Sequence, residues 1–492
     1  MRSTAWILLS AALFMLPQAR AEEGRGPLQP AKLPRVATVD ERYPSYDVEM
    51  AEVIGSQALP PADLSRPALR KLAAALGPAY VRVSGTAANT VYFHDSDAPP
   101  PAAPPKGFQG ILTRAEWKGV VDFARAVNAK IVTSFAISAG VRDPAGVWTP
   151  DQARKLVAYT KSIGGQIAAA ELFDEPTFPA AGGAPPGYDA AEFARDLAAF
   201  RRFARRAAPS MRIAGPGSAG EGVPVVAPST PMLHTEALLG EEPRPVFDVF
   251  SYHSYGAASL RCAGMGQLML TSPDQAMSEE WLSRSDKIHD FYQRLRDRFA
   301  PGKPIWVTET ADAACGGNPW ASSFLDSFRY LDQLGRLARR GVKVQMHRAL
   351  ASGESALIDP KTLTPRPDYW AALLWRRLMG TTVLDPGPSR EGLHLYAHCL
   401  RGHSGGVALL AINNTRNQPE SIELPVEAVR YTLSAKRLRE SRVDLNANTL
   451  RLQADGELPE LRPVPTLKGV VVLVPSSITF IAIAGAGNRA CR

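Results

Sequence analysis

The strongest constraint on the fold is a repeated order of elements. Between Tyr46 and Thr381 a short β-rich run is followed by a longer amphipathic helical run, eight times over. Eight such rounds predict an α/β fold of the (β/α)₈ TIM-barrel type, whose functional residues gather at the carboxyl ends of the strands. A doubly wound open sheet shows the same alternation and is the alternative. The predicted strands are Tyr46–Met50, Ala79–Val83, Lys130–Phe135, Ile167–Phe173, Met211–Ala214, Phe247–Tyr252, Pro304–Thr308 and Val342–Met346.

The pattern changes near the carboxyl terminus. From about Thr381 the helical periodicity stops, and alternating β-type runs such as Gly406–Ile412 and Val470–Ala482 begin. We therefore predict a barrel over residues 45–380 and a small all-β domain of sandwich type over residues 381–492.

Residues 1–21 have the pattern of a secretory signal peptide. Arg2 gives a basic start, Ala5 to Leu16 form an apolar run, and Ala19-Arg20-Ala21 is a small-x-small cleavage site. Pro17 closes the apolar run well before the roughly 20 residues that a membrane-spanning helix needs. We therefore expect a secreted or periplasmic protein that has no membrane association after cleavage.

The composition argues against a disordered chain and against a nucleic-acid-binding protein. The chain is 45% hydrophobic and 21% charged, as globular domains are, which argues against disorder. Its formal charge of +8, or +6 without the predicted signal peptide, is not gathered into basic blocks, so we expect no nucleic-acid partner. An exported chain with four cysteines is compatible with two disulfides, and the spacing leaves their pairing open. The cysteines are Cys262, Cys315, Cys399 and Cys491.

One histidine-rich segment resembles a metal site in composition only. It contains His394, His398, Cys399 and His403. If residues 394–399 form a strand, its first two histidines point away from Cys399, because successive side chains alternate between the two faces. We therefore expect no metal and no cofactor.

Two glutamates end the fourth and seventh predicted strands. Glu175 follows Asp174, and Glu309 closes the run Pro304-Ile-Trp-Val-Thr-Glu309. Both are predicted to project from the same end of a barrel. Retaining glycosidases need two carboxyl groups about 5–5.5 Å apart, a protonated acid for the leaving oxygen and an ionised carboxylate that attacks the anomeric carbon. The alternative is that both glutamates pair with buried arginines of the barrel wall.

Further motifs surround these glutamates. They are Leu76-Gly-Pro-Ala-Tyr-Val-Arg-Val-Ser-Gly-Thr86, Phe250-Ser-Tyr-His-Ser-Tyr255, Cys315-Gly-Gly-Asn-Pro319, Pro367-Asp-Tyr-Trp370, Leu395-Tyr-Ala-His-Cys399 and a terminal Cys491. With the two strand-end glutamates, they resemble clan A glycoside hydrolases and in detail the heparanase group, glycoside hydrolase family 79. The resemblance covers nearly the whole mature chain.

The resemblance implies a function and a set of site residues. It implies a retaining β-glucuronidase, with Glu175 as acid/base and Glu309 as nucleophile, that cleaves β-linked glucuronic acid in an anionic polysaccharide such as heparan sulfate. Tyr255 is expected beside the nucleophile. Glu49 and Thr86 are expected to line the sugar site, and Gly316 and Gly317 are expected to offer backbone N–H groups to the uronate, which suits charge-assisted hydrogen bonds.

The resemblance also bears on the architecture. It implies that residues 22–44 add a strand to the C-terminal sandwich. It implies a Cys399–Cys491 disulfide, which leaves Cys262 and Cys315 as a second pair on neighbouring loops at the active-site face. We expect a monomer that needs no proteolytic activation.

Three features depart from the family pattern. Asp174 stands where the family usually has Asn, whose amide donates to the sugar 2-hydroxyl; an ionised Asp can only accept. The uronate-binding tyrosine is missing near Ser355 and Ala356, and Arg348 either replaces it or pairs with a wall carboxylate. Basic clusters for sulfated chains are thin, with Arg261 the best candidate. The alternatives are therefore an exo-acting glycosidase of different sugar preference or a non-catalytic glycosaminoglycan-binding homologue.

Overall fold

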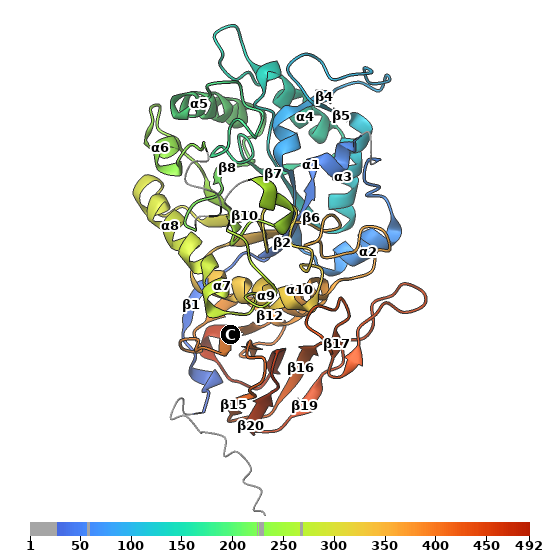
Figure 1. Ribbon diagram of the computed structural model, residues 1–492, viewed down its shortest axis with the longest axis vertical. Coiled ribbons are helices and arrows are strands. Elements are labelled where there is room, and N and C mark those ends of the chain that lie inside the picture. Colours follow the sequence, from blue (N-terminus) through green and yellow to red (C-terminus); the bar gives the residue numbers. More distant parts are fainter. Residues whose placement is uncertain (1–26, 57–59, 224, 226–230, 266–268) are drawn as a thin grey trace, which may run out of the picture.

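The computed structural model describes residues 27–56, 60–223, 225, 231–265 and 269–492 (Figure 1). The predicted signal peptide lies outside these residues. Among the helices that are described, none is both long and apolar enough to cross a membrane.

Eight parallel strands close into a barrel, which confirms the predicted fold over the open sheet. Each of the eight predicted strands overlaps one of them. The strands are β2 (Pro44–Glu49), β3 (Ala79–Ser84), β6 (Ala129–Thr133), β7 (Ile167–Ala170), β8 (Arg212–Ser218), β9 (Val249–Tyr255), β10 (Ile305–Ala311) and β11 (Val344–His347).

Helices surround the barrel, and local sequence signals fix where several of them start. Capping boxes start α3 at Thr113 and α5 at Asp189, and a proline occupies the first turn of α2 and α10. The helices are α1 (Met50–Ile54), α2 (Pro67–Ala75), α3 (Arg114–Ala126), α4 (Asp151–Ser162), α5 (Ala190–Ala207), α6 (Thr235–Gly240), α7 (Glu279–Leu282), α8 (Arg284–Phe299), α9 (Phe324–Arg339) and α10 (Pro367–Leu378). Their apolar faces pack on the barrel.

Strand β8 is longer than its sequence suggests. The prediction ends this strand at Ala214, whereas the parallel pairing with β9 continues to Ser218. An irregularity of the register between Pro216 and Ser218 accommodates the residue that has no N–H to donate.

The C-terminal part of the chain forms an antiparallel sheet of nine strands. They are β1 (Arg35–Thr38), β12 (Met379–Leu384), β13 (Leu393–Leu400), β14 (Val407–Asn413), β16 (Ala428–Ser434), β17 (Asp444–Leu445), β18 (Asn448–Thr449), β19 (Val464–Thr466) and β21 (Ser477–Ile483). Strand β1 comes from the N-terminal segment and pairs with β12. In Figure 1 this sheet lies below the barrel, next to α9 and α10.

Alternate side chains of this sheet enter two different cores. Leu410 and Phe480 join the core shared with the barrel helices, while Leu409 and Ile481 pack against a two-stranded ribbon. The ribbon consists of β15 (Glu420–Leu424) and β20 (Gly469–Leu473). The domain is therefore a sandwich with one large and one small sheet.

Both expected disulfides are present. Cys399 of β13 is bonded to Cys491, and Cys262 is bonded to Cys315. The second pair joins the loop after β9 to the loop after β10, at the carboxyl ends of the barrel strands.

Candidate active site

Two glutamates stand close together at the carboxyl ends of the strands. Glu309 lies on β10 and is 6% exposed, and Glu175 lies in the segment after β7 with 27% of its side chain exposed. One oxygen of each carboxyl group and a ring nitrogen of His253 lie within 4.8 Å of one another. Glu175 has a φ of 53°, a left-handed conformation that is unfavourable for residues other than glycine and concentrates at functional sites.

A buried arginine, Arg82 of β3, holds the centre of the site. Its Nη1 donates to Oε2 of Glu309 at 2.6 Å and to Oδ2 of Asp47 at 3.3 Å. Its Nη2 donates to Oδ1 of Asp174 and lies 3.6 Å from Oε2 of Glu171. Four carboxyl groups therefore surround one guanidinium inside the barrel.

Glu309 is held in its ionised form. The hydroxyl of Tyr255 donates to its Oε1, and Nε of Arg348 lies 3.8 Å from the same oxygen. Burial raises the pKa of a carboxyl group, but the basic side chains around Glu309 outweigh it and lower the pKa to about 2. A carboxylate that stays ionised at neutral pH suits a nucleophile.

Glu175 contacts the buried ring of His253. Nδ1 of His253 lies 3.0 Å from Oε1 of Glu175, and Nη2 of Arg82 lies 3.2 Å from Nε2. Burial lowers the pKa of His253, but the carboxylates of Glu309 and Glu175 outweigh it and raise the pKa to about 9. The ring is therefore protonated at neutral pH, and its Nδ1–H donates to Glu175 and orients it.

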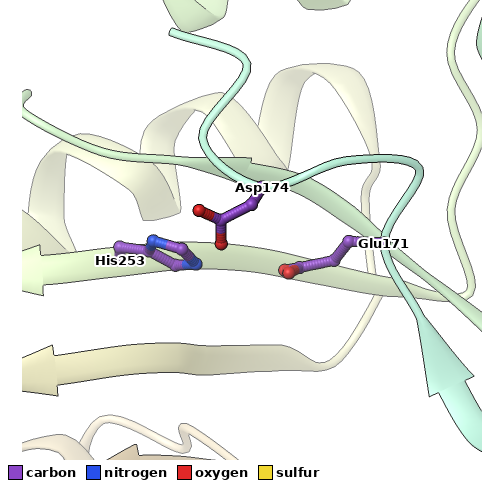
Figure 2. A group of neighbouring side chains, drawn as sticks. All are labelled: Glu171, Asp174 and His253. Carbon is purple, nitrogen blue, oxygen red and sulfur yellow. The ribbon is translucent and has the colours of Figure 1, made fainter. Parts of the chain in front are cut away.

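Asp174 is fixed by its backbone and turned into the barrel. The side chain of Asn89 accepts from its N–H at 2.8 Å and donates to its carbonyl oxygen at 2.9 Å. Figure 2 shows the carboxyl groups of Asp174 and Glu171 turned toward each other and toward the ring of His253. Such a group has the spacing to hold a cation, and Arg82 donates into it, so the guanidinium supplies the positive charge.

Arg348 pairs with a carboxylate, as one of the two predicted alternatives states. Its Nε donates to Oε1 of Glu49 at 2.8 Å, and 26% of its side chain is exposed. Its two terminal nitrogens donate no hydrogen bond to any residue that the structure describes. Gly85 makes room for this pair, because a Cβ atom at Gly85 would overlap Oε2 of Glu49. Thr86, next to Gly85, is exposed and has no described hydrogen bond to these groups.

The loop after β10 brings Gly316 and Gly317 to the same end of the barrel. Both have a φ of 82°, which glycine adopts without cost. Neither backbone N–H donates to any residue within the described parts of the chain. The Cys262–Cys315 disulfide fixes the start of this loop, and Arg261 beside it pairs with Glu354 of the loop after β11.

The structure adds site residues that the sequence analysis did not single out. Arg82, Asp47, Glu171 and His253 are buried charged or titratable residues in or next to strands that are otherwise apolar. This was a usable signal, because a buried charge needs a partner. The identity of the partners depends on barrel closure, which the sequence does not show.

Comparison with known proteins places the chain in a family. The sequence model described as "Glycosyl hydrolase family 79, N-terminal domain" matches residues 53–335. The chain belongs to glycosyl hydrolase family 79. It is 27% identical to heparanase-like protein 1 of Arabidopsis thaliana, over 87% of this chain and 86% of the relative.

Two mammalian relatives of this family 79 protein match over less than half of either chain. Mouse heparanase is 30% identical over 44% of each chain. The human protein named inactive heparanase-2 is 31% identical over 42% of this chain and 39% of its own.

A solved structure supports the same architecture. The 4-O-α-L-rhamnosyl-β-D-glucuronidase of Fusarium oxysporum superposes with a TM-score of 0.68 over 92% of this chain and 99% of its own, at 14% identity. At that identity the likeness shows the fold alone. The family and the fold are those of a glycoside hydrolase, and the two disulfides fit an extracellular or lumenal compartment.

Proposed function

We propose that the protein is a retaining glycoside hydrolase that cleaves β-linked glucuronic acid within an anionic polysaccharide such as heparan sulfate. The observation that carries the proposal is the closeness of Glu175 and Glu309, whose nearest carboxyl oxygens lie within 4.8 Å. Retaining enzymes hold the two carboxyl groups about 5–5.5 Å apart, whereas inverting enzymes leave about 6.5–9.5 Å for a water molecule.

The environments of the two glutamates support different roles. Glu309 is buried, ionised and held by Arg82 and Tyr255, so it attacks the anomeric carbon. Glu175 is more exposed and protonates the glycosidic oxygen as the leaving group departs. The resulting carboxylate of Glu175 is stabilised by Nδ1–H of His253 and then removes a proton from the water that releases the sugar from Glu309.

Unpaired donors at the site support an acidic sugar. The terminal nitrogens of Arg348 and the backbone N–H groups of Gly316 and Gly317 have no described acceptor. A uronate carboxylate provides one, and hydrogen bonds to an ionised group are about twice as strong as neutral ones. Similarity to heparanases supports the same substrate class.

The first test is size-exclusion chromatography of heparan sulfate after incubation with the purified mature protein. We expect shorter fragments from the wild type and none from Glu309→Gln, which keeps the shape but cannot form the glycosyl-enzyme bond. Glu460→Gln is the matched control, since Glu460 is exposed on the C-terminal domain and, among the described residues, pairs with Arg462 alone. An unchanged chain length with the wild type contradicts endo-cleavage.

The stereochemical outcome tests the mechanism separately. Proton NMR of an aryl β-glucuronide during hydrolysis is expected to show the β anomer as the first product. An initial α anomer would rule out retention.

An exo-acting glycosidase of different sugar preference is the second candidate. The likeness of fold to a glucuronidase that acts on a rhamnosyl-glucuronide favours it. A panel of aryl β-glycosides distinguishes the two, because an exo-enzyme releases the aryl group rapidly while the length of heparan sulfate stays unchanged. Binding of heparan sulfate without release of any product supports a non-catalytic homologue.

A further inference from the structure

The carboxyl groups around Arg82 outnumber the positive charges that they contact. The side chains of Asp47, Glu171, Asp174 and Glu309 are at most 8% exposed, and all four face this one guanidinium. An unpaired buried carboxylate costs several kcal/mol, so such groups take up protons instead. The folded protein therefore keeps protons on part of this group.

One of the four carboxyl groups is held as an anion, because Glu309 accepts from Arg82 at 2.6 Å and from the hydroxyl of Tyr255. Oε1 of Glu171 accepts from the hydroxyls of Ser251 at 2.7 Å and Thr308 at 2.8 Å, while its Oε2 is enclosed without a hydrogen-bond partner among the described residues. Burial raises the pKa of Asp47 and of Asp174, so these two carboxyl groups hold protons.

Asp47 and Asp174 differ in what their second oxygen meets. Oδ1 of Asp47 is enclosed and has no partner, so a proton on Asp47 stays within the barrel. Oδ1 of Asp174 accepts from Arg82. Its Oδ2 has no hydrogen-bond partner among the described residues and, unlike Oδ1 of Asp47, is not fully enclosed. Asp174 precedes Glu175 in the chain and shares the guanidinium with Glu309, so its carboxyl group lies next to both glutamates of the proposed site.

We propose that Asp174 is protonated in the active enzyme and donates its O–H to the sugar hydroxyl next to the anomeric carbon. The proposal rests on the proposed function, since it assumes that a sugar binds between Glu175 and Glu309. Hydrogen bonds to that hydroxyl strengthen as the transition state forms. A carboxylic acid supplies the donor that a carboxylate lacks.

The surroundings of Asp174 make this donor dependent on pH. Burial raises the pKa of Asp174 to about 7, although Arg82 lowers it. The other titratable groups around it are Glu309, His253 and Glu175, with Asp47 and Glu171 across the guanidinium. The acid form is therefore present below about pH 7 and is lost as the pH rises through that value.

Activity on two substrates separates the effect of the Asp174 donor from general acid catalysis by Glu175. We would measure kcat/KM for an aryl β-glucuronide and for its 2-deoxy analogue between pH 5 and 9. The ratio of the two values cancels general acid catalysis and reports on the contact with the hydroxyl. For the wild type we expect the ratio to fall by tenfold or more above pH 7.

Two variants complete the test. Asp174→Asn keeps a donor at every pH, so its ratio is expected to stay high and constant. Asp174→Ala has no donor, so its ratio is expected to be low and constant. A ratio for the wild type that does not change with pH, or that Asp174→Asn reproduces at every pH, overturns the proposal.

A measurement on the free protein separates this proposal from the proposed function. Infrared spectra of protein labelled with ¹³C-carboxyl aspartate are expected to show a carboxylic acid band that disappears near pH 7 and is missing in Asp174→Asn. If the band is present and no glycoside is cleaved, the proposed function is wrong, but the protonation of Asp174 is supported. If the band is missing in the wild type, the further inference fails by itself.

Discussion

At the scale of single residues, the hydrogen bonds that Glu309 accepts affect both its charge and its reactivity. Oε1 and Oε2 of Glu309 accept from different strands, Tyr255 at the end of β9 and Arg82 on β3. These donors keep Glu309 ionised, and they also withdraw electron density from the attacking oxygen. Removing one of them therefore has two opposing effects, and the loss of position and charge is expected to be the larger.

Tyr255→Phe tests this balance. A hydrogen bond to a charged group contributes about 1.5–3 kcal/mol, so we expect kcat/KM to fall by about tenfold or more. The hydroxyl of Tyr255 also lowers the pKa of Glu309. Without it that pKa rises, and the acid limb of the pH profile moves to higher pH. An acid limb that stays in place would show that Tyr255 does not act on Glu309.

Sequence alone predicts part of this site, and the reason is local. Glu175 and Glu309 follow recognisable strands, and a barrel puts strand ends together. The contact of Arg82 with Glu309 joins residues 227 positions apart. The residue pattern of β3 does not show which carboxyl groups Arg82 contacts. The contact of Arg348 with Glu49 likewise depends on the closure of β11 against β2.

At the scale of elements, the close packing of α9 on β13 connects the barrel to the C-terminal sheet. The periodicity of Phe324, Phe328, Leu331 and Leu334 predicts this helix. It does not predict that Gly335 faces the ring of Tyr396, where a Cβ atom would overlap the ring. Helices and strands are local, so the sequence shows them; the contact between two elements depends on side-chain volumes on both sides.

Gly335→Ala is expected to destabilise the protein even though alanine favours helices. The gain in helix propensity is about 1 kcal/mol, whereas forcing a methyl group into a filled contact costs about 1–3 kcal/mol. The hydroxyl of Tyr396 is bonded to Asp332, so the ring has little freedom to move away. We expect a lower midpoint in calorimetric unfolding.

Gly119→Ala on α3 is the matched control, because nothing lies within 4 Å of a Cβ atom at that position. It is expected to leave the midpoint unchanged or to raise it. A midpoint that rises equally in both variants would contradict the overlap at Gly335.

At the scale of the whole molecule, a buried imidazole connects the two domains. Nδ1 and Nε2 of His394 on β13 contact Asp332 of α9 and Glu279 of α7. Burial lowers the pKa of this histidine, but the two carboxylates outweigh it and raise the pKa to about 9. Arg336 pairs with both carboxylates from the barrel side. A charged histidine therefore holds the C-terminal domain against the barrel.

The contribution of His394 to stability depends on pH. Its pKa is higher in the folded protein than the usual 6.5, so its contribution is complete below about pH 6.5 and is lost as the pH rises through about 9. A shift of this size corresponds to on the order of 3 kcal/mol. His394→Gln is therefore expected to lower the free energy of unfolding in urea at pH 6 and much less at pH 10.

His403→Gln, at an exposed position on the same domain, serves as the control. It is expected to leave the free energy of unfolding unchanged at both pH values. A loss in His394→Gln that is the same at pH 6 and pH 10 would contradict a charged role for this histidine.

The pairing of β1 with β12 puts Arg35 opposite Leu384, so a segment that precedes the barrel in the chain lies in a sheet whose other strands follow the barrel. The sheet cannot form until residues far along the chain have been translated, and the barrel between them has time to fold first. The same pairing protects the edge of β12. A protease that cuts between β1 and β2 and releases β1 would expose that edge, and unpaired strand edges recruit other chains. We therefore expect solubility, before catalysis, to be the first property lost on such a cut.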